Sequence, residues 1–500
     1  MWCLLKAFQL LHLLLFLLIF QANLSSSSSS ITQLCSPEEA AALIQFKTSF
    51  SIDEYSSGEC DESYPKTNSW KEGSDCCSWD GVTCDNIKGQ VIGLDLSCSQ
   101  LYGSIPFNSS LFHLPHLQKL NLAFNNFNYS EMSSKFSGFA SLMYLNLSDS
   151  NFAGEVPSQI SHLSKLVSLD LSQNYYQTID KHTLEGPNRG YNENLGLYFP
   201  KVNQSINLQL LDLSGMSFST ESIDSIGNLQ SLKYLDLCGT SFPGGLPKTI
   251  MNLSSLEHLD ASVSSFSGGL DNSIGNLLSL EYLNLQLSDL SGSIPISLGN
   301  LSQLNYLDLT SNYFSGQIPS SLTNLRQLEL LDISYNQLEG SIPDEVAAFP
   351  NLISLDLSFN LLNGTLPSWL YTASTLKYIA VRNNQLNGDV KEFKYKSLEE
   401  IFLRNNKLTG PIPSSIFQFV NLTILDLSSN NLSGIVEFDM FSKLQNLQHL
   451  DLSYNSLSLS SNGCLLQGCP VFGLLCCLAV AHSHPNACSL LFCSPVLIPG

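Results

Sequence analysis

Residues 304–327 read LNYLDLTSNYFSGQIPSSLTNLRQ, and this stretch decides the fold because variants of it fill most of the chain. Leu307 and Leu309 follow the spacing of a short strand, and Tyr306 and Asp308 alternate with them. Successive side chains of a strand point to opposite faces. We therefore expect the leucines on a buried face, and the tyrosine and the aspartate on the opposite face.

The pattern L-x-x-L-x-L-x-x-N-x-L recurs fifteen times, which makes it the organising feature of the chain. From Leu208 to Leu376 every step is 24 residues, and the other steps are 22 to 26 residues except for one of 42. The units begin at Val91, Leu117, Leu142, Leu166, Leu208, Leu232, Leu256, Leu280, Leu304, Leu328, Leu352, Leu376, Leu398, Leu422 and Leu447. A fixed period of this length predicts one elongated α/β repeat body instead of several globular domains.

Each unit is expected to add one strand to a parallel sheet, and its leucines to fill a core that one repeat alone could not close. The ninth position is often asparagine, as at Asn312, whose amide can satisfy backbone groups at the inner turn. In other units this position is Ser150, Met216, Thr240, Ser264 or Ser288, where we expect a looser inner turn or a different curvature. A following G-x-I-P suits a glycine turn and an irregular or 3₁₀ outer side.

The N-terminal stretch MWCLLKAFQLLHLLLFLLIF, followed by QANLSSSSSS, has the charged start, apolar core and polar exit of a secretory signal peptide. We predict a signal peptide at 1–24, with cleavage between 22 and 30. An uncleaved membrane anchor is the alternative, but the apolar run at 10–20 is shorter than the roughly 20 residues that a membrane span requires.

The repeats and the segment before them resemble a known family. The pattern is that of a leucine-rich repeat, and G-x-I-P matches its plant-specific class. CSPEEAAALIQFKTSF at 35–50 and SWKEGSDCCSWDGVTCDNIKGQVIGLDLS at 69–97 resemble the plant N-terminal leucine-rich-repeat cap. With LDLSCSQLYGSI at 94–105, the chain resembles the Cf-type receptor-like proteins of plant immunity. This resemblance implies a horseshoe or superhelical solenoid with a parallel concave sheet and a disulfide-bonded N-terminal cap.

Fourteen cysteines in a secreted chain indicate disulfides, because the secretory compartment is oxidising. Cys60 and Cys98 either pair with each other or are spare, since six cysteines in this region allow fifteen pairings. The pairs that the resemblance implies are Cys35 with Cys76, and Cys77 with Cys84.

The sequence divides into four regions. After the signal peptide come a cap at 35–90, about fifteen repeats at 91–458 with an irregular segment at 175–207, and an apolar, cysteine-rich tail at 459–500. The irregular segment is either a degenerate repeat or a loop over one face. The tail is interpreted as the product of an altered transcript or gene model that truncates the protein, as a divergent C-terminal cap, as a lipid-anchor signal, or as a metal site.

The chain carries 43 acidic and 22 basic side chains, a formal net charge of −21. This charge repels phosphate backbones and anionic lipid headgroups, so nucleic acid is not an expected partner. The acidity provides either solubility or a docking surface for a basic ligand. The motifs of serine hydrolases, zinc proteases and kinases are missing from the sequence, so we expect no enzyme, and we assign no metal site and no cofactor.

The positions that alternate with the leucines form the expected concave face, where an aromatic column stands out. Four successive repeats place Tyr234, His258, Tyr282 and Tyr306 at one position, and carboxylates run beside them. Exposed aromatic residues of this kind suit binding hot spots. Alternatively, the rings recur with the repeat consensus and stack on each other. The candidate ligand-binding acidic residues are Asp236, Asp260, Asp308 and Asp332.

Nine N-x-S/T motifs beyond the signal peptide are expected to accept glycans in a secreted chain. Asn146 lies on a predicted strand and faces the concave side, so a glycan there would exclude ligand from that end. The nine asparagines are Asn108, Asn128, Asn146, Asn203, Asn252, Asn300, Asn363, Asn421 and Asn431.

The resemblance implies an extracellular receptor-like protein at the plasma membrane that binds a protein or peptide ligand in plant defence or cell-surface signalling. It also implies a co-receptor kinase as partner, and contact with the membrane if a full-length form carries a transmembrane helix. One alternative is a secreted inhibitor of pathogen cell-wall enzymes, similar to polygalacturonase-inhibiting proteins. Another is a nonfunctional or decoy fragment.

Overall fold

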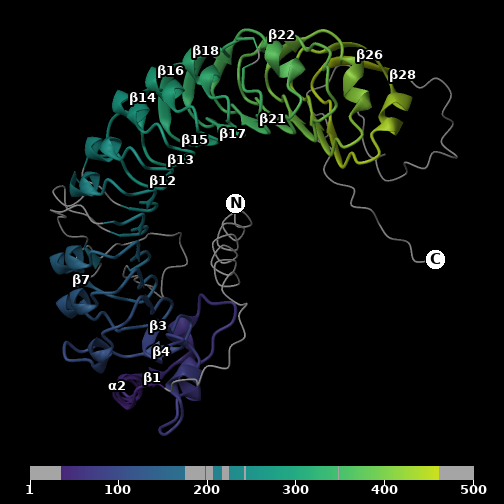
Figure 1. Ribbon diagram of the computed structural model, residues 1–500. Coiled ribbons are helices and arrows are strands. Elements are labelled where there is room, and N and C mark those ends of the chain that lie inside the picture. Colours follow the sequence, from purple (N-terminus) through teal and green to yellow (C-terminus); the bar gives the residue numbers. More distant parts are fainter. Residues whose placement is uncertain are drawn as a thin grey trace, which may run out of the picture.

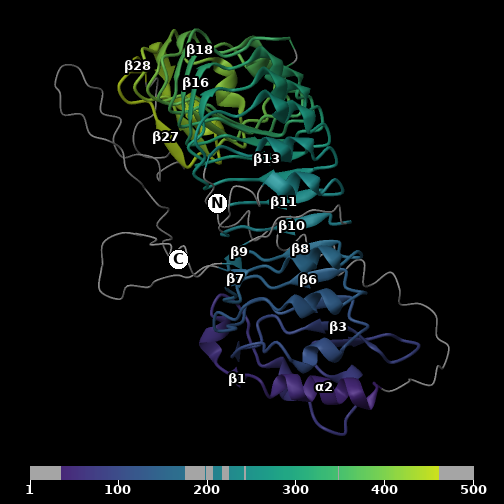
Figure 2. The same ribbon diagram turned by 90° about the vertical axis from the view of Figure 1, so that its left-hand side faces the viewer.

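A computed structural model describes residues 35–174, 197–198, 207–216, 224–240, 244–346 and 348–460. This part of the chain forms a curved solenoid, an arch with the N-terminal cap at one end and β28 (Ser456–Ser460) at the other (Figure 1). The successive strands are stacked one above the other (Figure 2). The elongated repeat body predicted from the fixed period is therefore confirmed, and it is the leucine-rich-repeat solenoid that the resemblance implied.

A sheet of sixteen strands lines the concave side of the arch. Its first pair, β2 with β3, is antiparallel, whereas all later pairs are parallel and keep one register. The strands of this concave sheet, in spatial order, are β2 (Val82–Cys84), β3 (Val91–Asp95), β5 (Lys119–Asn121), β6 (Tyr144–Asn146), β8 (Ser168–Asp170), β10 (Leu210–Asp212), β11 (Tyr234–Asp236), β12 (His258–Asp260), β13 (Tyr282–Asn284), β15 (Tyr306–Asp308), β17 (Leu330–Asp332), β19 (Ser354–Asp356), β21 (Tyr378–Ala380), β23 (Glu400–Phe402), β25 (Ile424–Asp426) and β27 (His449–Asp451).

The concave sheet continues directly across the 42-residue step. β8 pairs directly with β10, which places Leu169 beside Leu211. Within the step, β9 (Leu197–Tyr198) pairs with β7 (Gly154–Glu155) outside this sheet. Most of the irregular segment at 175–207 lies outside the described residues.

The convex side carries short 3₁₀ helices, one of the two arrangements expected from the G-x-I-P pattern. Pro295, Pro319 and Pro413 each stand at the N-cap of such a helix. The helices are η4 (Ser110–His113), η5 (Ser134–Gly138), η6 (Ser158–His162), η7 (Ile226–Asn228), η8 (Lys248–Asn252), η9 (Asn272–Asn276), η10 (Ile296–Asn300), η11 (Ser320–Asn324), η12 (Ser368–Thr372), η13 (Ser414–Gln418) and η14 (Phe438–Lys443).

Small parallel sheets between the concave and convex sides were not expected from the sequence. The largest contains β14 (Ser291–Ser293), β16 (Tyr313–Gln317), β18 (Gln337–Ser341) and β20 (Leu361–Asn363). Two pairs follow it, β22 (Asn387–Asp389) with β24 (Lys407–Thr409), and β26 (Ser433–Glu437) with β28. They give the segment after each inner turn a second set of backbone hydrogen bonds.

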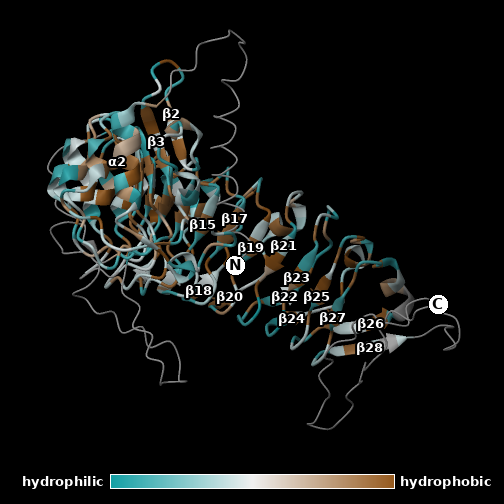
Figure 3. Ribbon diagram, turned by 90° about the horizontal axis from the view of Figure 1, so that it is seen from below, coloured by the Kyte–Doolittle hydropathy of each residue, from teal (hydrophilic) through white to brown (hydrophobic). Residues whose placement is uncertain are grey.

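The core runs along the axis of the solenoid and is filled by the consensus leucines. Leu304, Leu307 and Leu309 are fully buried, and Phe314 of the same repeat is buried with them. Both hydrophobic and hydrophilic residues occur along the strands of the C-terminal half (Figure 3). Each repeat therefore buries its apolar face against its two neighbours, as the predicted axial core requires.

The asparagine of the inner turn has the predicted role. Asn312 donates from Nδ2 to the carbonyl oxygens of Leu285 and Leu309, at 2.7 and 3.1 Å. Its Oδ1 accepts hydrogen bonds from the backbone N–H groups of Ser288 and Leu290. One buried side chain thereby satisfies backbone groups of two repeats, which would otherwise be costly to bury.

Where serine or threonine replaces the asparagine, a hydroxyl group performs part of its role. Ser288 Oγ lies 2.8 Å from the carbonyl oxygen of Ala261 and 3.0 Å from that of Gln286. A hydroxyl has one donor, whereas an amide has two donors and an acceptor. The inner turn at Ser288 is therefore held by fewer hydrogen bonds from this side chain than the inner turn at Asn312.

The N-terminal cap covers the first repeat with α2 (Pro37–Lys47), the short helices η1 (Glu54–Ser57), η2 (Lys66–Ser69) and η3 (Cys76–Ser78), and strand β1 (Ser51–Ile52). β1 pairs with β4 (Leu101–Tyr102) of the first repeat. Glu39 of α2 is buried and accepts a hydrogen bond from the backbone N–H of Val91. The expected disulfides, Cys35 with Cys76 and Cys77 with Cys84, are both present.

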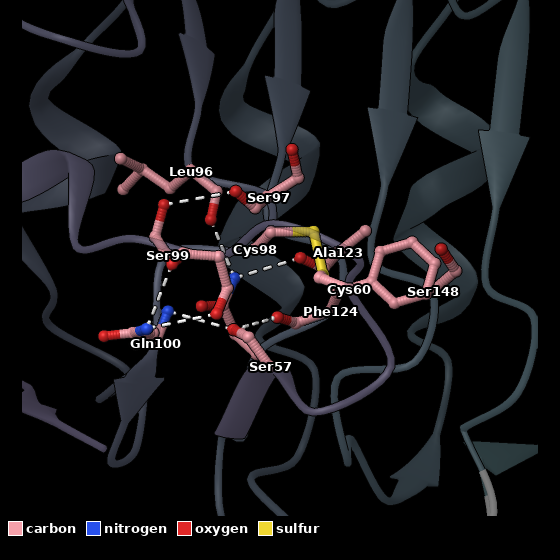
Figure 4. The surroundings of a disulfide bond; sticks show 12 residues. Ser57, Cys60, Leu96, Ser97, Cys98, Ser99, Gln100, Ala123, Phe124 and Ser148 are labelled. Atoms are coloured by element: carbon pink, nitrogen blue, oxygen red, sulfur yellow. Dashed lines mark hydrogen bonds between the residues drawn. A yellow bond between two sulfur atoms is a disulfide. The ribbon is translucent and has the colours of Figure 1, made fainter. Parts of the chain in front are cut away.

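A third disulfide joins Cys60 to Cys98 and answers the question that the sequence left open (Figure 4). Cys98 belongs to the inner turn of the first repeat, and its backbone N–H donates to the carbonyl oxygen of Ala123. Ser57 Oγ donates to the carbonyl oxygen of Phe124, 2.6 Å away. The loop of the cap is thus fastened to the inner turns of two repeats.

Two predicted regions lie outside the described residues, namely the signal peptide at 1–24 and, apart from 459 and 460, the tail at 459–500. Among the residues that are described, no helix has the length and apolar character needed to cross a membrane.

Candidate ligand-binding surface

The aromatic column predicted on the concave face is formed. Tyr234, His258, Tyr282 and Tyr306 begin strands β11, β12, β13 and β15 and lie side by side in the sheet. The ring centroids of successive members are 4.3, 4.0 and 4.3 Å apart, and the planes are nearly parallel. All four side chains are partly exposed. The rings therefore cover each other's faces and present their edges to a ligand.

Aspartates at the fifth position of the repeats form a row beside the column, called here the carboxylate ladder, and it includes Asp212, Asp236, Asp260, Asp308 and Asp332. These carboxylates also have a structural role that was not predicted from the sequence. Asp236 Oδ1 accepts a hydrogen bond from the backbone N–H of Cys238 at 2.8 Å, and Asp308 Oδ1 accepts one from Thr310 at 2.9 Å. The same bond recurs between Asp332 and Ser334. The recurring D-x-S/T was the signal for this turn, because aspartate commonly accepts from the N–H two residues ahead. One oxygen of each of these carboxylates therefore accepts a hydrogen bond from the backbone.

The second carboxylate oxygen connects the ladder to the rings. Asp236 Oδ2 accepts from the hydroxyl of Tyr234 at 3.4 Å, and Asp308 Oδ2 accepts from that of Tyr306 at 3.3 Å. Asp260 instead accepts a hydrogen bond from the amide of Asn284 at 2.9 Å. The column and the ladder therefore constitute one polar and aromatic surface.

Burial and the nearby negative charges raise the pKa values of several carboxyl groups in the ladder. Burial raises the pKa of Asp212 to about 7, and the nearby carboxylate of Asp170 contributes to the rise. Burial also raises the pKa of Asp308 to about 6, and that of Asp236 well above its usual range. Part of the ladder is therefore protonated near neutral pH. A positively charged ligand group would favour the ionised form of these carboxyl groups.

The predicted glycan acceptors lie mostly at exposed positions. Asn146 is the exception among the described sites, because it is partly buried on β6 and its Oδ1 accepts hydrogen bonds from Ser148. Asn203 lies outside the described residues. The exposed acceptors are Asn108, Asn128, Asn252, Asn300, Asn363, Asn421 and Asn431.

Among the described residues, one cluster has sulfur atoms close enough together to share a metal ion, namely Cys35, Cys76 and Cys77. All three sulfurs are engaged in disulfides. They lack the thiolates that a metal site requires.

Family models match the N-terminal cap and the repeats. The leucine rich repeat N-terminal domain matches residues 36–85. The model of a single Leucine Rich Repeat matches nine stretches, at 141–163, 207–229, 231–253, 303–325, 327–349, 351–373, 397–419, 421–442 and 446–470.

Similar curated proteins are plant receptor-like proteins. Receptor-like protein 6 of Arabidopsis thaliana is 42% identical over 213 residues, which cover 41% of this chain and 20% of the relative. Receptor-like protein Cf-9 of Solanum pimpinellifolium is 37% identical over 243 residues, which cover 45% of this chain and 28% of the relative. The aligned region thus spans less than a third of either relative.

Two solved structures share the fold. The ectodomain of the receptor kinase GASSHO1/SCHENGEN3 from Arabidopsis thaliana, in complex with CASPARIAN STRIP INTEGRITY FACTOR 2, has a TM-score of 0.67 and 31% identity, covering 83% of this chain and 47% of that one. The ectodomain of the Arabidopsis receptor kinase HAESA, in complex with an IDA peptide hormone ligand, has a TM-score of 0.53 and 26% identity, covering 84% and 70%. The matched regions are leucine-rich-repeat ectodomains, which are non-enzymatic, and this agrees with the expectation of a non-enzymatic chain.

Proposed function

Because the chain is a leucine-rich-repeat protein homologous to plant receptor-like proteins of the Cf-9 type, we propose that it is an extracellular receptor that binds a protein or peptide on its concave face. The observation that carries this proposal is the stacked column of Tyr234, His258, Tyr282 and Tyr306 beside the carboxylate ladder. Stacked rings with polar edges offer a rigid anchoring surface, because few rotatable bonds have to be ordered on binding.

The proposal extends to signalling through a partner kinase at the plasma membrane, in plant defence or a related response. Two of the structures with this fold are ectodomains bound to a peptide hormone or an integrity factor. Their ligands support a protein or peptide ligand for the present chain, and the Cf-9-type relatives support a receptor role. The three disulfides of the cap suit an oxidising extracellular environment.

The proposal can be tested by selecting phage-displayed random 12-residue peptides on the secreted chain. Peptides selected by the native chain should bind the triple variant Tyr234→Ala, Tyr282→Ala, Tyr306→Ala at least about thirtyfold more weakly, as expected when anchor residues are removed. A matched triple variant outside the column, Tyr64→Ala, Tyr102→Ala, Tyr313→Ala, removes three other exposed tyrosines and should bind normally.

Equal affinity of the two triple variants for every selected peptide would contradict a concave binding face. The same preparations can be assayed for inhibition of a fungal pectinase. Inhibition that persists in both variants would replace the receptor proposal with that of an inhibitor of pathogen enzymes.

A further inference from the structure

Two consecutive repeats depart from the pattern that all the others follow on the concave face. The fifth position of the unit is aspartate or asparagine in every repeat except those that begin at Leu376 and Leu398, where it is Ala380 and Phe402. The seventh position is small or uncharged in every other repeat, and in the same two it is arginine, at Arg382 and Arg404. A residue that recurs with the consensus is explained by the fold, whereas this paired departure is not.

The two arginines lie side by side on the concave side of the arch. β21 and β23 are neighbouring strands, with Ala380 beside Phe402 in the register. Beyond them, the backbone N–H of Asn383 donates to the carbonyl oxygen of Arg404, which continues the pairing into the inner turn. Side chains at positions five and seven of a repeat share one face, since they are two residues apart on an extended segment. The backbones of the two arginines therefore lie about one strand spacing apart, or roughly 4.8 Å, and both side chains leave the sheet on the same side.

The guanidinium group of Arg382 is held between two aromatic rings. Its Cζ lies 5.6 Å from the ring centroid of Phe359 and 5.3 Å from that of Phe402. Its Nε is buried and has no hydrogen-bond partner in the described part of the chain. Stacking between rings orients a guanidinium group without using its N–H donors. A buried donor without an acceptor is costly, so the protein itself leaves the guanidinium group of Arg382 incompletely hydrogen-bonded.

The two arginines have no carboxylate within ion-pair distance among the described residues. Neither Arg382 nor Arg404 forms an ion pair within the described ranges, and Arg404 is exposed. Burial raises the pKa of Asp356 in the preceding repeat, and Arg382 offsets only part of this rise because it lies beyond the distance of an ion pair. The Asp356 carboxylate is already bound by the hydroxyl of Tyr378 and the backbone N–H of Ser358.

We propose that Arg382 and Arg404 form an oxyanion-binding site on the concave face, which takes a carboxylate or sulfate group of the ligand. The inference rests on the proposed function, and it adds the chemical class of one ligand group. A planar fork of donors matches a carboxylate or a sulfate oxyanion, and two adjacent forks can bind its oxygens together. Phe402 and Tyr378, whose ring centroids are 5.6 Å apart, offer apolar surface beside this charge.

The test uses benzoate as the probe, because it combines a carboxylate with an aromatic ring. Saturation-transfer NMR on the full secreted chain, at constant ionic strength, should detect benzoate binding that acetate and inorganic sulfate both displace. The variant Arg382→Gln, Arg404→Gln should bind benzoate about tenfold or more weakly, because the charge-assisted hydrogen bonds are lost. Displacement by acetate but not by sulfate would assign the site to carboxylates, and the reverse would assign it to sulfate groups.

A control variant, Arg326→Gln, makes the same change of charge as the single variant Arg404→Gln, but on the outer side after η11, and should bind benzoate like the native chain. The single variant Arg404→Gln keeps the packing of Arg382 intact, so it tests the site even if the double variant is poorly folded. Unchanged benzoate affinity in Arg404→Gln and in the double variant would overturn the proposal. The triple tyrosine variant should retain benzoate binding, so failure of the peptide selection and failure of the oxyanion site are separate outcomes.

Discussion

The imidazole ring of His258 stacks on the phenol ring of Tyr282, with 4.0 Å between the ring centroids and 10° between the planes. The two residues are 24 positions apart in sequence and side by side in adjacent strands. The contact exists because β12 and β13 pair in one register. It therefore depends on the alignment of the two repeats and also forms part of the candidate binding surface.

Replacing His258 by alanine should interrupt the aromatic column. We expect the free energy of local opening of β11, β12 and β13 to fall by about 1 kcal/mol, since a stacked aromatic pair contributes about 0.5–1.5 kcal/mol beyond its buried area. Hydrogen exchange of the backbone amides in these strands measures this change. His258→Tyr should restore the protection. His449→Ala, at the same position of the exposed end strand β27, provides the control.

The stability of the solenoid should depend on pH through the buried carboxyl groups. The folded-state pKa values of Asp212 and Asp308 are raised to about 7 and about 6, so between pH 4 and pH 7 the unfolded chain releases these protons first. The free energy of unfolding should therefore decrease as the pH rises through this window.

The substitution Asp308→Asn should weaken that pH dependence, and asparagine already occupies the same position at Asn284. The effect should be at most about 3 kcal/mol, because one pKa unit corresponds to about 1.4 kcal/mol. Denaturant unfolding at pH 4, 5.5 and 7 gives the comparison. Asp85→Asn is the control, because the backbone N–H groups of Lys88 and Ile87 lower the pKa of Asp85 instead of raising it. A steeper decrease in Asp308→Asn than in the native chain would refute the burial explanation.

Asn312→Ala should destabilise the repeats on both sides of the inner turn. The substitution leaves buried carbonyl and N–H groups of two repeats without a partner, at a cost of roughly 2–4 kcal/mol. Asn312→Ser should lose less, because serine at the equivalent position of the preceding repeat keeps two of the bonds. Thermal unfolding of the two variants beside Asn351→Ala, an exposed asparagine, measures the difference. Equal losses in the alanine and serine variants would contradict this role.

Removing the third disulfide should loosen the loop of the cap. The bond between Cys60 and Cys98 closes a segment with a sequence separation of 38, so its loss should lower the free energy of unfolding by about 2–4 kcal/mol. In Cys60→Ser, Cys98→Ser we also expect faster proteolytic cleavage between residues 53 and 64. Cys238→Ser is the matched control, because this cysteine forms no disulfide. Identical cleavage rates in both variants would show that the hydrogen bonds of Ser57 alone hold the loop.

Glycan occupancy should follow the exposure of the acceptor amide. Asn252 and Asn300 are exposed on the convex side, so they should be largely occupied in the secreted protein. Asn146 should be less occupied, because it is partly buried and its side chain is hydrogen-bonded to Ser148. Glycopeptide mass spectrometry gives the occupancy of each site. Full occupancy at Asn146 would place a glycan on the concave face and exclude ligand from that end.

Most of the fold followed from the sequence because one structural unit is repeated. The spacing of Leu304, Leu307 and Leu309 indicated the strand and the core, and Asn312 indicated the inner turn. The parallel flanking sheets were not foreseen, since β16 and β18 are made of backbone pairing between residues with no shared hydrophobic pattern. The partnership of Cys60 and Cys98 depended on the three-dimensional path of the cap, and cysteine spacing does not determine that path.

The candidate site was predictable in part. The positions of Tyr282 and Tyr306 in one column followed from the period, and the stacking of their rings was one of the two expected arrangements. The double role of Asp308 was missed, because recurrence alone does not separate a turn-closing carboxylate from a ligand-binding one. Arg382 was missed because the consensus was used to find what recurs, whereas this residue is recognised by its departure from the consensus and by the two rings around it.

Because the register of the concave sheet is constant, the distance between two sites on it is set by the number of repeats between them. Tyr306 and Arg382 belong to units that begin at Leu304 and Leu376, three steps apart, or about 14 Å along the sheet at about 4.8 Å per strand. Loss of one intervening unit, such as residues 328–351, would bring the two sites one strand closer and leave each of them intact. Duplication of that unit would move them one strand apart. The length of ligand that reaches both sites can therefore evolve in discrete increments, through gain or loss of whole repeats, without any change in the residues that touch it.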